Sequence, residues 1–142
     1  MNIINTINEA YKKFEQSNWE KIYWVIDLHG TIIGHTDKKD INIVPPVYPH
    51  VEPVLSLLSQ RGDICLILNT STSRTHLEKT LEYLKKLGIK FDYINENPES
   101  RSSEFTDYSK KYYYDILLDD KAGFEPEDWW EIELFVINYY GL

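Results

Sequence analysis

The amino-acid sequence predicts an α/β protein, a Rossmann-like three-layer α/β/α sandwich with a mostly parallel sheet. Short apolar runs typical of buried strands alternate along the chain with segments whose apolar residues recur at helical spacing. This alternation implies right-handed crossovers, which place helices over the faces of a parallel sheet. At 142 residues the chain fits one domain over residues 1–142, in which residues 1–18 form an N-terminal helix packed on the core.

The first half of the chain predicts a helix, a strand and a second helix. Residues 3–14 place apolar side chains at helical spacing with Lys and Glu between them, which is typical of an amphipathic helix. The apolar run 22–26 predicts a strand that ends at Asp27, and an extended, proline-rich loop follows. Residues 51–58 predict the next helix, which accommodates Pro53 only in its first turn.

The second half continues the alternation. Residues 64–69 predict a second strand, and the leucines after it predict a helix that ends at Gly88 in a left-handed cap. Residues 91–94 and 115–118 predict two further strands with a polar, irregular stretch between them. A last helix, rich in aromatic residues, begins near Pro126.

The first strand delivers a carboxylate to its end, in the sequence Asp-Leu-His-Gly-Thr of residues 27–31. An aspartate at the end of a buried strand, followed by a Gly-Thr turn, is typical of an active-site platform at the edge of an α/β sheet. An aspartate near a glycine is also common in ordinary turns, so this motif alone leaves both interpretations open.

The motif resembles the first motif of the haloacid dehalogenase superfamily, usually Asp-x-Asp-Gly-Thr, with His29 in place of the second aspartate. Further motifs follow in the order of that superfamily: a hydroxyl residue after the second strand, a lysine before the fourth, and an acidic pair after the fourth. In this sequence they are Thr70 or Ser71, Lys111 or Lys110, and Asp119 with Asp120. The tail is similar to that of small, capless bacterial and phage proteins of the superfamily, and the resemblance spans roughly residues 24–135.

This resemblance implies a Mg²⁺-dependent phosphatase or phosphotransferase, of the phosphoric monoester hydrolase class, that works through an aspartyl phosphate. Asp27 would attack phosphorus and also bind the metal, and His29 would bind the metal through its backbone carbonyl. The third metal ligand would be Asp119 or Asp120. The residues implied to hold the phosphate are Thr70, Ser71, Lys111, Gly30 and Thr31.

The strand order of the superfamily is fourth, first, second, third, which makes the ends of the first and fourth strands neighbours at a topological switch point. With that order, Asp27, Asp119 and Asp120 would converge. Three carboxylates in one crevice repel one another unless a cation or a proton lies among them, and oxygen ligands select a hard ion such as Mg²⁺. A single cysteine and scattered histidines argue against a zinc site.

His29 leaves two functional interpretations open. A histidine can donate a proton to a leaving oxygen and accept one from water, so it could replace the missing aspartate as general acid and base. Alternatively, the replacement disables turnover, and the chain is a pseudoenzyme that binds a metal or a phosphate. A third interpretation is an unrelated doubly wound protein without phosphate chemistry.

Composition restricts the partners. A net charge of -8 opposes an extended contact with nucleic acid. The only cysteine, Cys65, lies in an apolar run and is expected to be a small core residue. Neither a secretory signal nor a long apolar segment is evident, which predicts a cytoplasmic protein without a membrane contact. Residues 32–48 and 95–108 are too short for a cap domain, which suggests a bulky phosphorylated substrate or closure of the site by a partner subunit in a homo-oligomer.

The remaining histidines and the tryptophan pair are expected to be structural. His35, His50 and His76 show no ligand spacing and are expected at the surface or at helix caps. Trp129 and Trp130 are expected to pack as a core and a surface aromatic residue.

Overall fold

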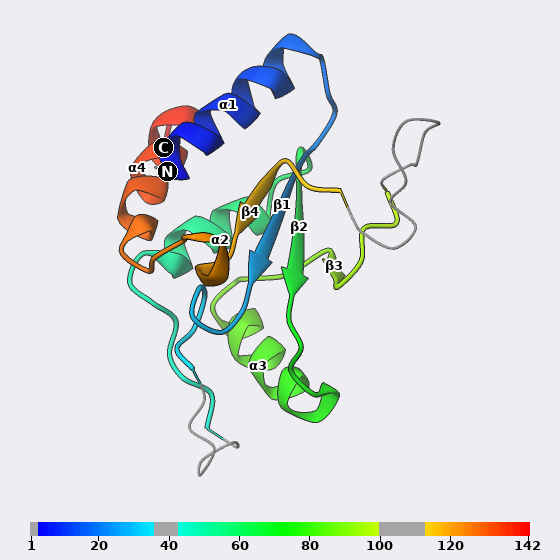
Figure 1. The fold of residues 1–142 in the computed structure, drawn as a ribbon, viewed down its shortest axis with the longest axis vertical. Helices are drawn as coiled ribbons and strands as arrows, with labels where there is room; N and C mark the ends of the chain where they lie inside the picture. Colours follow the sequence, from blue (N-terminus) through cyan, green and yellow to red (C-terminus); the bar gives the residue numbers. More distant parts are fainter. Residues whose placement is uncertain (1–2, 36–42, 100–112) are drawn as a thin grey trace.

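A computed structural model describes residues 3–35, 43–99 and 113–142 of the chain. Its strands are β1 (Ile22–Asp27), β2 (Ile64–Asn69), β3 (Tyr93–Ile94) and β4 (Ile116–Leu118), and within the described residues they form one parallel sheet in the order β3-β2-β1-β4 (Figure 1). This is the predicted order. The predicted third and fourth strands begin later than expected. Before them, the amides of Asp92 and Asp115 donate to the neighbouring strand, and their side chains accept from the amides of Leu66 and Tyr23.

The helices are α1 (Ile3–Gln16), α2 (Val51–Ser59), α3 (Arg74–Lys86) and α4 (Asp128–Tyr140), and a short 3-10 helix, η1 (Asp120–Ala122), follows β4. Pro53 lies in the first turn of α2, and Gly88 follows α3 with a left-handed φ of 83°, as predicted. With an all-parallel sheet and helices between the strands, the chain has the predicted Rossmann-like α/β fold.

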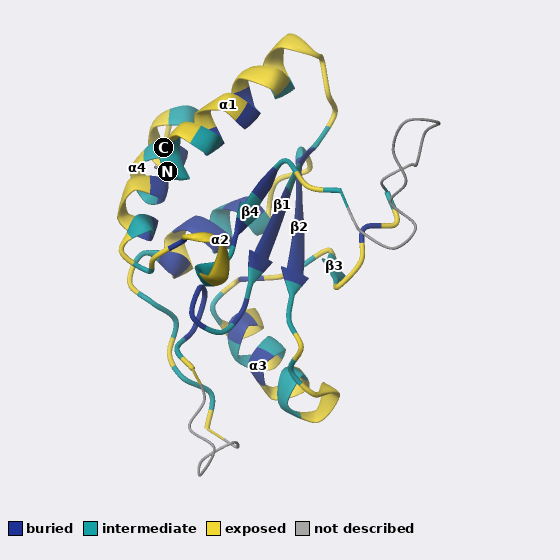
Figure 2. Ribbon diagram, in the orientation of Figure 1, coloured by how far each residue is buried: buried dark blue, intermediate teal, exposed yellow. Residues whose placement is uncertain are grey.

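One face of the sheet carries most of the core. Alternate residues of the strands, such as Trp24, Leu66 and Ile116, are fully buried in a cluster that also includes side chains of all four α-helices. Figure 2 shows the buried strands and the buried inner stripes of the helices, whose outer sides are exposed. Trp129 is fully buried and Trp130 is 54 % exposed, which confirms the expected division between core and surface.

The opposite face carries a smaller cluster formed by Val25, Cys65 and Ile67. Cys65 is fully buried there, as predicted. Residues 95–99, which follow β3, begin the connection to β4. At the described start of that connection, Glu99 accepts hydrogen bonds from Lys21 at 2.9 Å and from the hydroxyl of Tyr93 at 2.8 Å.

None of the helices in the described part of the chain has the length and apolar character needed to cross a bilayer.

Candidate active site

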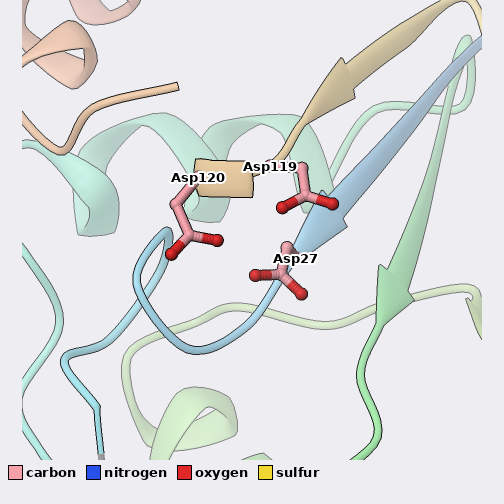
Figure 3. A group of neighbouring side chains, drawn as sticks. All are labelled: Asp27, Asp119 and Asp120. Carbon is pink, nitrogen blue, oxygen red and sulfur yellow. The ribbon is translucent and has the colours of Figure 1, made fainter. Parts of the chain in front are cut away.

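Three carboxylates meet at the carboxyl end of the sheet. Asp27 is the last residue of β1, and Asp119 and Asp120 follow β4, which pairs with β1 in parallel. Each of the three offers a carboxylate oxygen, and these oxygens all lie within 4.8 Å of one another. Figure 3 shows the three side chains turned toward the same point. The predicted convergence is therefore present in the fold.

The turn after β1 is built so that Asp120 can approach it. The carbonyl of Leu28 accepts hydrogen bonds from the amides of Ile32 at 2.9 Å and Ile33 at 3.1 Å, which closes a tight loop. Gly30 lies in this loop with φ of 84°, a conformation that favours glycine. A Cβ atom on Gly30 would lie 2.8 Å from Cγ of Asp120, so a side chain at this position cannot be accommodated without moving that carboxylate.

Thr31 joins the acidic turn, formed by Asp119 and Asp120 after β4, to the turn after β1. Its hydroxyl accepts a hydrogen bond from the amide of Asp120 at 3.1 Å, and its carbonyl accepts one from the indole of Trp129 at 2.7 Å. Thr31 is fully buried and is absent from the cavity lining. The resemblance implies that Thr31 binds the phosphate; in the described contacts, its hydroxyl and carbonyl join η1 and α4 to the turn after β1.

Burial and the two neighbouring carboxylates oppose ionisation of Asp27. The pKa of Asp27 is raised to about 6, first by burial and then by the negative charges of Asp119 and Asp120. Oδ1 of Asp120 is buried and has no hydrogen-bond partner among the described residues. An orphaned carboxylate oxygen beside two further carboxylates, with oxygen donors only, fits a hard divalent cation such as Mg²⁺.

These carboxylates open onto a cavity of about 700 Å³. The predicted site residues that line it are Asp27, His29, Thr70, Ser71, Asp119 and Asp120. Four residues that were not predicted for the site also line it: His35, Asn69, Asn95 and Lys121. Lys111 and its alternative Lys110 lie outside the described residues.

Asn95 and His35 were missed because their contacts are far apart in sequence. Asn95 follows β3, and its side chain accepts a hydrogen bond from the amide of Thr70 and donates one to its carbonyl, both at 2.8 Å. This clamp fixes Thr70 at the end of β2. His35 is exposed, as expected, but its Nε2 lies 3.6 Å from a carboxylate oxygen of Asp120, so it belongs to the rim of the site. The left-handed φ of 57° at Asn95 is a conformation that asparagine tolerates, yet no sequence pattern identified its partner.

His29 is joined to Thr70 through Thr72. Its Nδ1 lies 3.2 Å from the carbonyl of Gly34, which can only accept, and its Nε2 lies 3.1 Å from the Thr72 hydroxyl. The Thr72 hydroxyl lies 2.8 Å from that of Thr70. In a neutral ring, Nδ1 carries the proton, so Thr72 donates to Nε2 and Thr70 donates to Thr72. With a second proton on the ring, Nε2 would instead donate to the Thr72 hydroxyl.

The other two histidines lie where they were expected. His50 is the residue before α2 and pairs with Glu133 of α4. His76, in the first turn of α3, lies 2.6 Å from the hydroxyl of Ser73, the residue before that helix.

Comparison with known proteins gives a fold but no activity. No family model and no curated protein matches this chain. A solved structure, that of the conserved protein coded by locus from Bacteroides thetaiotaomicron, is similar with a TM-score of 0.62 and 25% sequence identity, over 84% of this chain and 92% of that chain. The chain thus shares its α/β fold, over most of its length, with a conserved protein of that bacterium.

Proposed function

We propose that this chain is a capless, Mg²⁺-dependent phosphatase or phosphotransferase of the haloacid dehalogenase type, in which Asp27 forms an aspartyl phosphate. The observation that carries this proposal is the convergence of Asp27, Asp119 and Asp120, whose oxygens lie within 4.8 Å of one another beside the large cavity. This convergence of carboxylates follows from the strand order, and it brings together the residues that the motif order of the superfamily had selected from the sequence.

Asp27, Asp119 and Asp120 would hold the cation. The buried, unpartnered Oδ1 of Asp120 and the raised pKa of Asp27 support this assignment, because a cation relieves both costs. When bound, Mg²⁺ neutralises the carboxylates and the charge that develops on the phosphoryl oxygens.

Asp27 would supply the nucleophile. One of its carboxylate oxygens attacks phosphorus, the bond from phosphorus to the alcohol oxygen breaks, and the electron pair stays on that oxygen, which takes up a proton. Water then attacks phosphorus, the bond to the Asp27 oxygen breaks, and inorganic phosphate leaves with the carboxylate restored. The hydrogen-bonded path from Thr70 through Thr72 to His29 would exchange the protons of these two steps.

Thr70 and Ser71 would bind the phosphoryl oxygens. Both residues line the cavity, and they lie in the segment between the end of β2 and the start of α3. The clamp from Asn95 fixes the backbone of Thr70, which keeps its hydroxyl in place before a substrate enters. Lys121, also in the lining, adds a positive charge next to the acidic turn.

The test is hydrolysis of p-nitrophenyl phosphate with and without Mg²⁺ by the wild type, Asp27→Asn and His29→Asp, with the exposed Glu131→Gln as a matched charge-removal control. We expect Mg²⁺-dependent turnover that Asp27→Asn reduces at least about a thousandfold. Glu131→Gln should retain it. Turnover by Asp27→Asn at the wild-type rate would contradict the proposal.

A second candidate, a pseudoenzyme that binds a metal or a phosphate, is favoured by one observation. Both ring nitrogens of His29 already lie within hydrogen-bond distance of Gly34 and Thr72, so neither is directed at the carboxylates by those contacts. The His29→Asp variant separates the candidates. Activity that appears only in His29→Asp indicates a scaffold disabled at this residue, whereas activity that falls in His29→Asp indicates a working histidine.

A further inference from the structure

A second, smaller cavity of about 180 Å³ adjoins the carboxylate cavity. His29 lines both, and Thr72, which holds its ring, lines the second. The smaller cavity lies between the loop residues Val44 and Pro45 and the side of α3 that carries His76. A group bound at the phosphate site would therefore lie next to this second cavity at His29.

The size of this cavity restricts what it can hold. A cavity of roughly 150 Å³ with apolar walls accommodates a benzene molecule. At about 180 Å³, the second cavity therefore has room for one six-membered ring with small substituents.

The lining suits a flat ring. Val44, Pro45 and the buried Thr80 contribute aliphatic groups to the lining, and His29 and His76 contribute imidazole rings, on which an aromatic ring can stack. None of the described residues that line this cavity is a carboxylate, and Lys79 is among them, in contrast to the acidic first cavity. A ring attached to a phosphate would meet no negative charge here.

We propose that the second cavity binds the alcohol part of the substrate, and that this part carries a single flat ring. The substrate class is then a phosphate monoester of a one-ring aromatic or heteroaromatic alcohol. This inference rests on the proposed phosphate site, because that site determines which group faces the second cavity. It replaces the bulky substrate suggested by the sequence with a compact one.

The experiment is calorimetric titration, in the presence of Mg²⁺, with three phosphonates that cannot be hydrolysed: benzylphosphonate, cyclohexylmethylphosphonate and ethylphosphonate. We expect benzylphosphonate to bind at least about tenfold more tightly than ethylphosphonate, and more tightly than its puckered-ring counterpart. Equal affinity for benzyl and ethyl compounds, or binding of neither, would overturn the inference.

Two variants locate the ring. Val44→Phe fills the cavity and should reduce benzylphosphonate affinity to that of ethylphosphonate, whereas Ile137→Phe on exposed α4 is the matched control and should change neither. His76→Ala enlarges the cavity and should favour naphthylmethylphosphonate over benzylphosphonate. A ring preference that both Val44→Phe and His76→Ala leave unchanged would place the ring elsewhere and overturn the assignment.

The outcome is independent of turnover. Ring-selective binding without Mg²⁺-dependent hydrolysis would uphold the second cavity and contradict the proposed enzyme. Hydrolysis lost in Asp27→Asn, without ring selectivity, would uphold the enzyme and contradict the second cavity.

Discussion

Single residues around the carboxylates are constrained by close approach rather than by charge alone. Gly30 is the clearest case, because both its φ and the nearby Asp120 side chain exclude a Cβ atom. Thr72 is constrained differently: its hydroxyl is the link between two residues of the proposed reaction, His29 and Thr70. Each constraint yields a test at the scale of one side chain.

Gly30→Ala is expected to lower the free energy of unfolding by about 1–3 kcal/mol and to abolish the stabilisation by Mg²⁺, because the new methyl group displaces Asp120. Gly141→Ala is the control, since Gly141 also has a positive φ, of 71°, but an added Cβ would meet nothing within 4 Å. It should lose stability through strain and keep its Mg²⁺ response. Thermal unfolding with and without Mg²⁺ measures the stability and the Mg²⁺ response of both variants. An unchanged Mg²⁺ response in Gly30→Ala would show that the added methyl group does not disturb Asp120.

Thr72→Val keeps the shape of the side chain and removes the hydroxyl that joins His29 to Thr70. We expect kcat for p-nitrophenyl phosphate to fall about tenfold, which corresponds to the loss of one hydrogen bond of about 1.4 kcal/mol. Thr72→Ser restores the hydroxyl and should restore most of the rate. If the Val and Ser variants have the same kcat, the path through Thr72 plays no part in turnover.

At the scale of secondary-structure elements, the site depends on contacts between the turn after β1 and the segments that follow β4. The indole of Trp129, in the first turn of α4, donates a buried hydrogen bond to the carbonyl of Thr31. The hydroxyl of the same Thr31 accepts from Asp120 in η1. Helix α4 is thus tied to the turn that follows Asp27 and contacts Asp120.

Trp129→Phe removes the indole donor and leaves a buried carbonyl without its partner. The expected cost is about 1–3 kcal/mol in the free energy of unfolding, with weaker Mg²⁺ binding as a second effect. Trp130→Phe, the neighbouring and largely exposed tryptophan, should change stability by no more than about 0.5 kcal/mol. Urea denaturation measures the free energy of unfolding of the two variants. Equal losses of stability would show that the Trp129 hydrogen bond does not stabilise the fold.

At the scale of the whole molecule, the carboxylate cluster opposes folding of the metal-free protein. Burial and the neighbouring carboxylates raise the pKa of Asp27 to about 6, so the folded state binds a proton there more tightly than the unfolded chain does. An acid with a raised folded-state pKa contributes stability at low pH. That contribution is lost as the pH rises from about 4 to the folded-state value of about 6.

Without Mg²⁺, the melting temperature of the wild type should therefore decrease relative to that of Asp27→Asn as the pH is raised from 5 to 7. At pH 7 the metal-free variant should be the more stable protein, by roughly 2–5 °C, and saturating Mg²⁺ should reverse the order. Differential scanning calorimetry at both pH values tests this. A wild type that is more stable than Asp27→Asn at pH 7 without metal would contradict the assumed repulsion.

Local pattern was sufficient to predict most of the elements. Residues 22–27 and 64–69 are apolar runs of strand length, and both are strands; leucines at helical spacing predicted α3 and its glycine cap. The short β3 was predicted two residues too long: before it, Asp92 contacts Leu66 of β2 through its amide and, in place of its carbonyl, through its side chain. Side-chain pairing of this kind leaves no periodic signal.

The candidate site was predictable only in part. The order of the motifs selected Asp27, Asp119 and Asp120, since each follows an apolar strand and residues at the carboxyl ends of parallel strands meet at one edge. Asn95 carried no such signal, because its role depends on a clamp to Thr70 across the sheet. The contacts of Thr31 carried no such signal either, because its partners Asp120 and Trp129 are far away in the sequence.

The sequence by itself determined the α/β class, the elements and the three carboxylates, because hydrophobic periodicity and the ends of apolar runs are local properties of a chain. Only the tertiary structure decided that Asp120 keeps a buried oxygen without a hydrogen-bond partner among the described residues, that His29 is held by Thr72, and that a ring-sized cavity adjoins the site. These features depend on distances between segments far apart in the chain. Such distances are set by how the sheet and helices pack, which no single stretch of residues encodes.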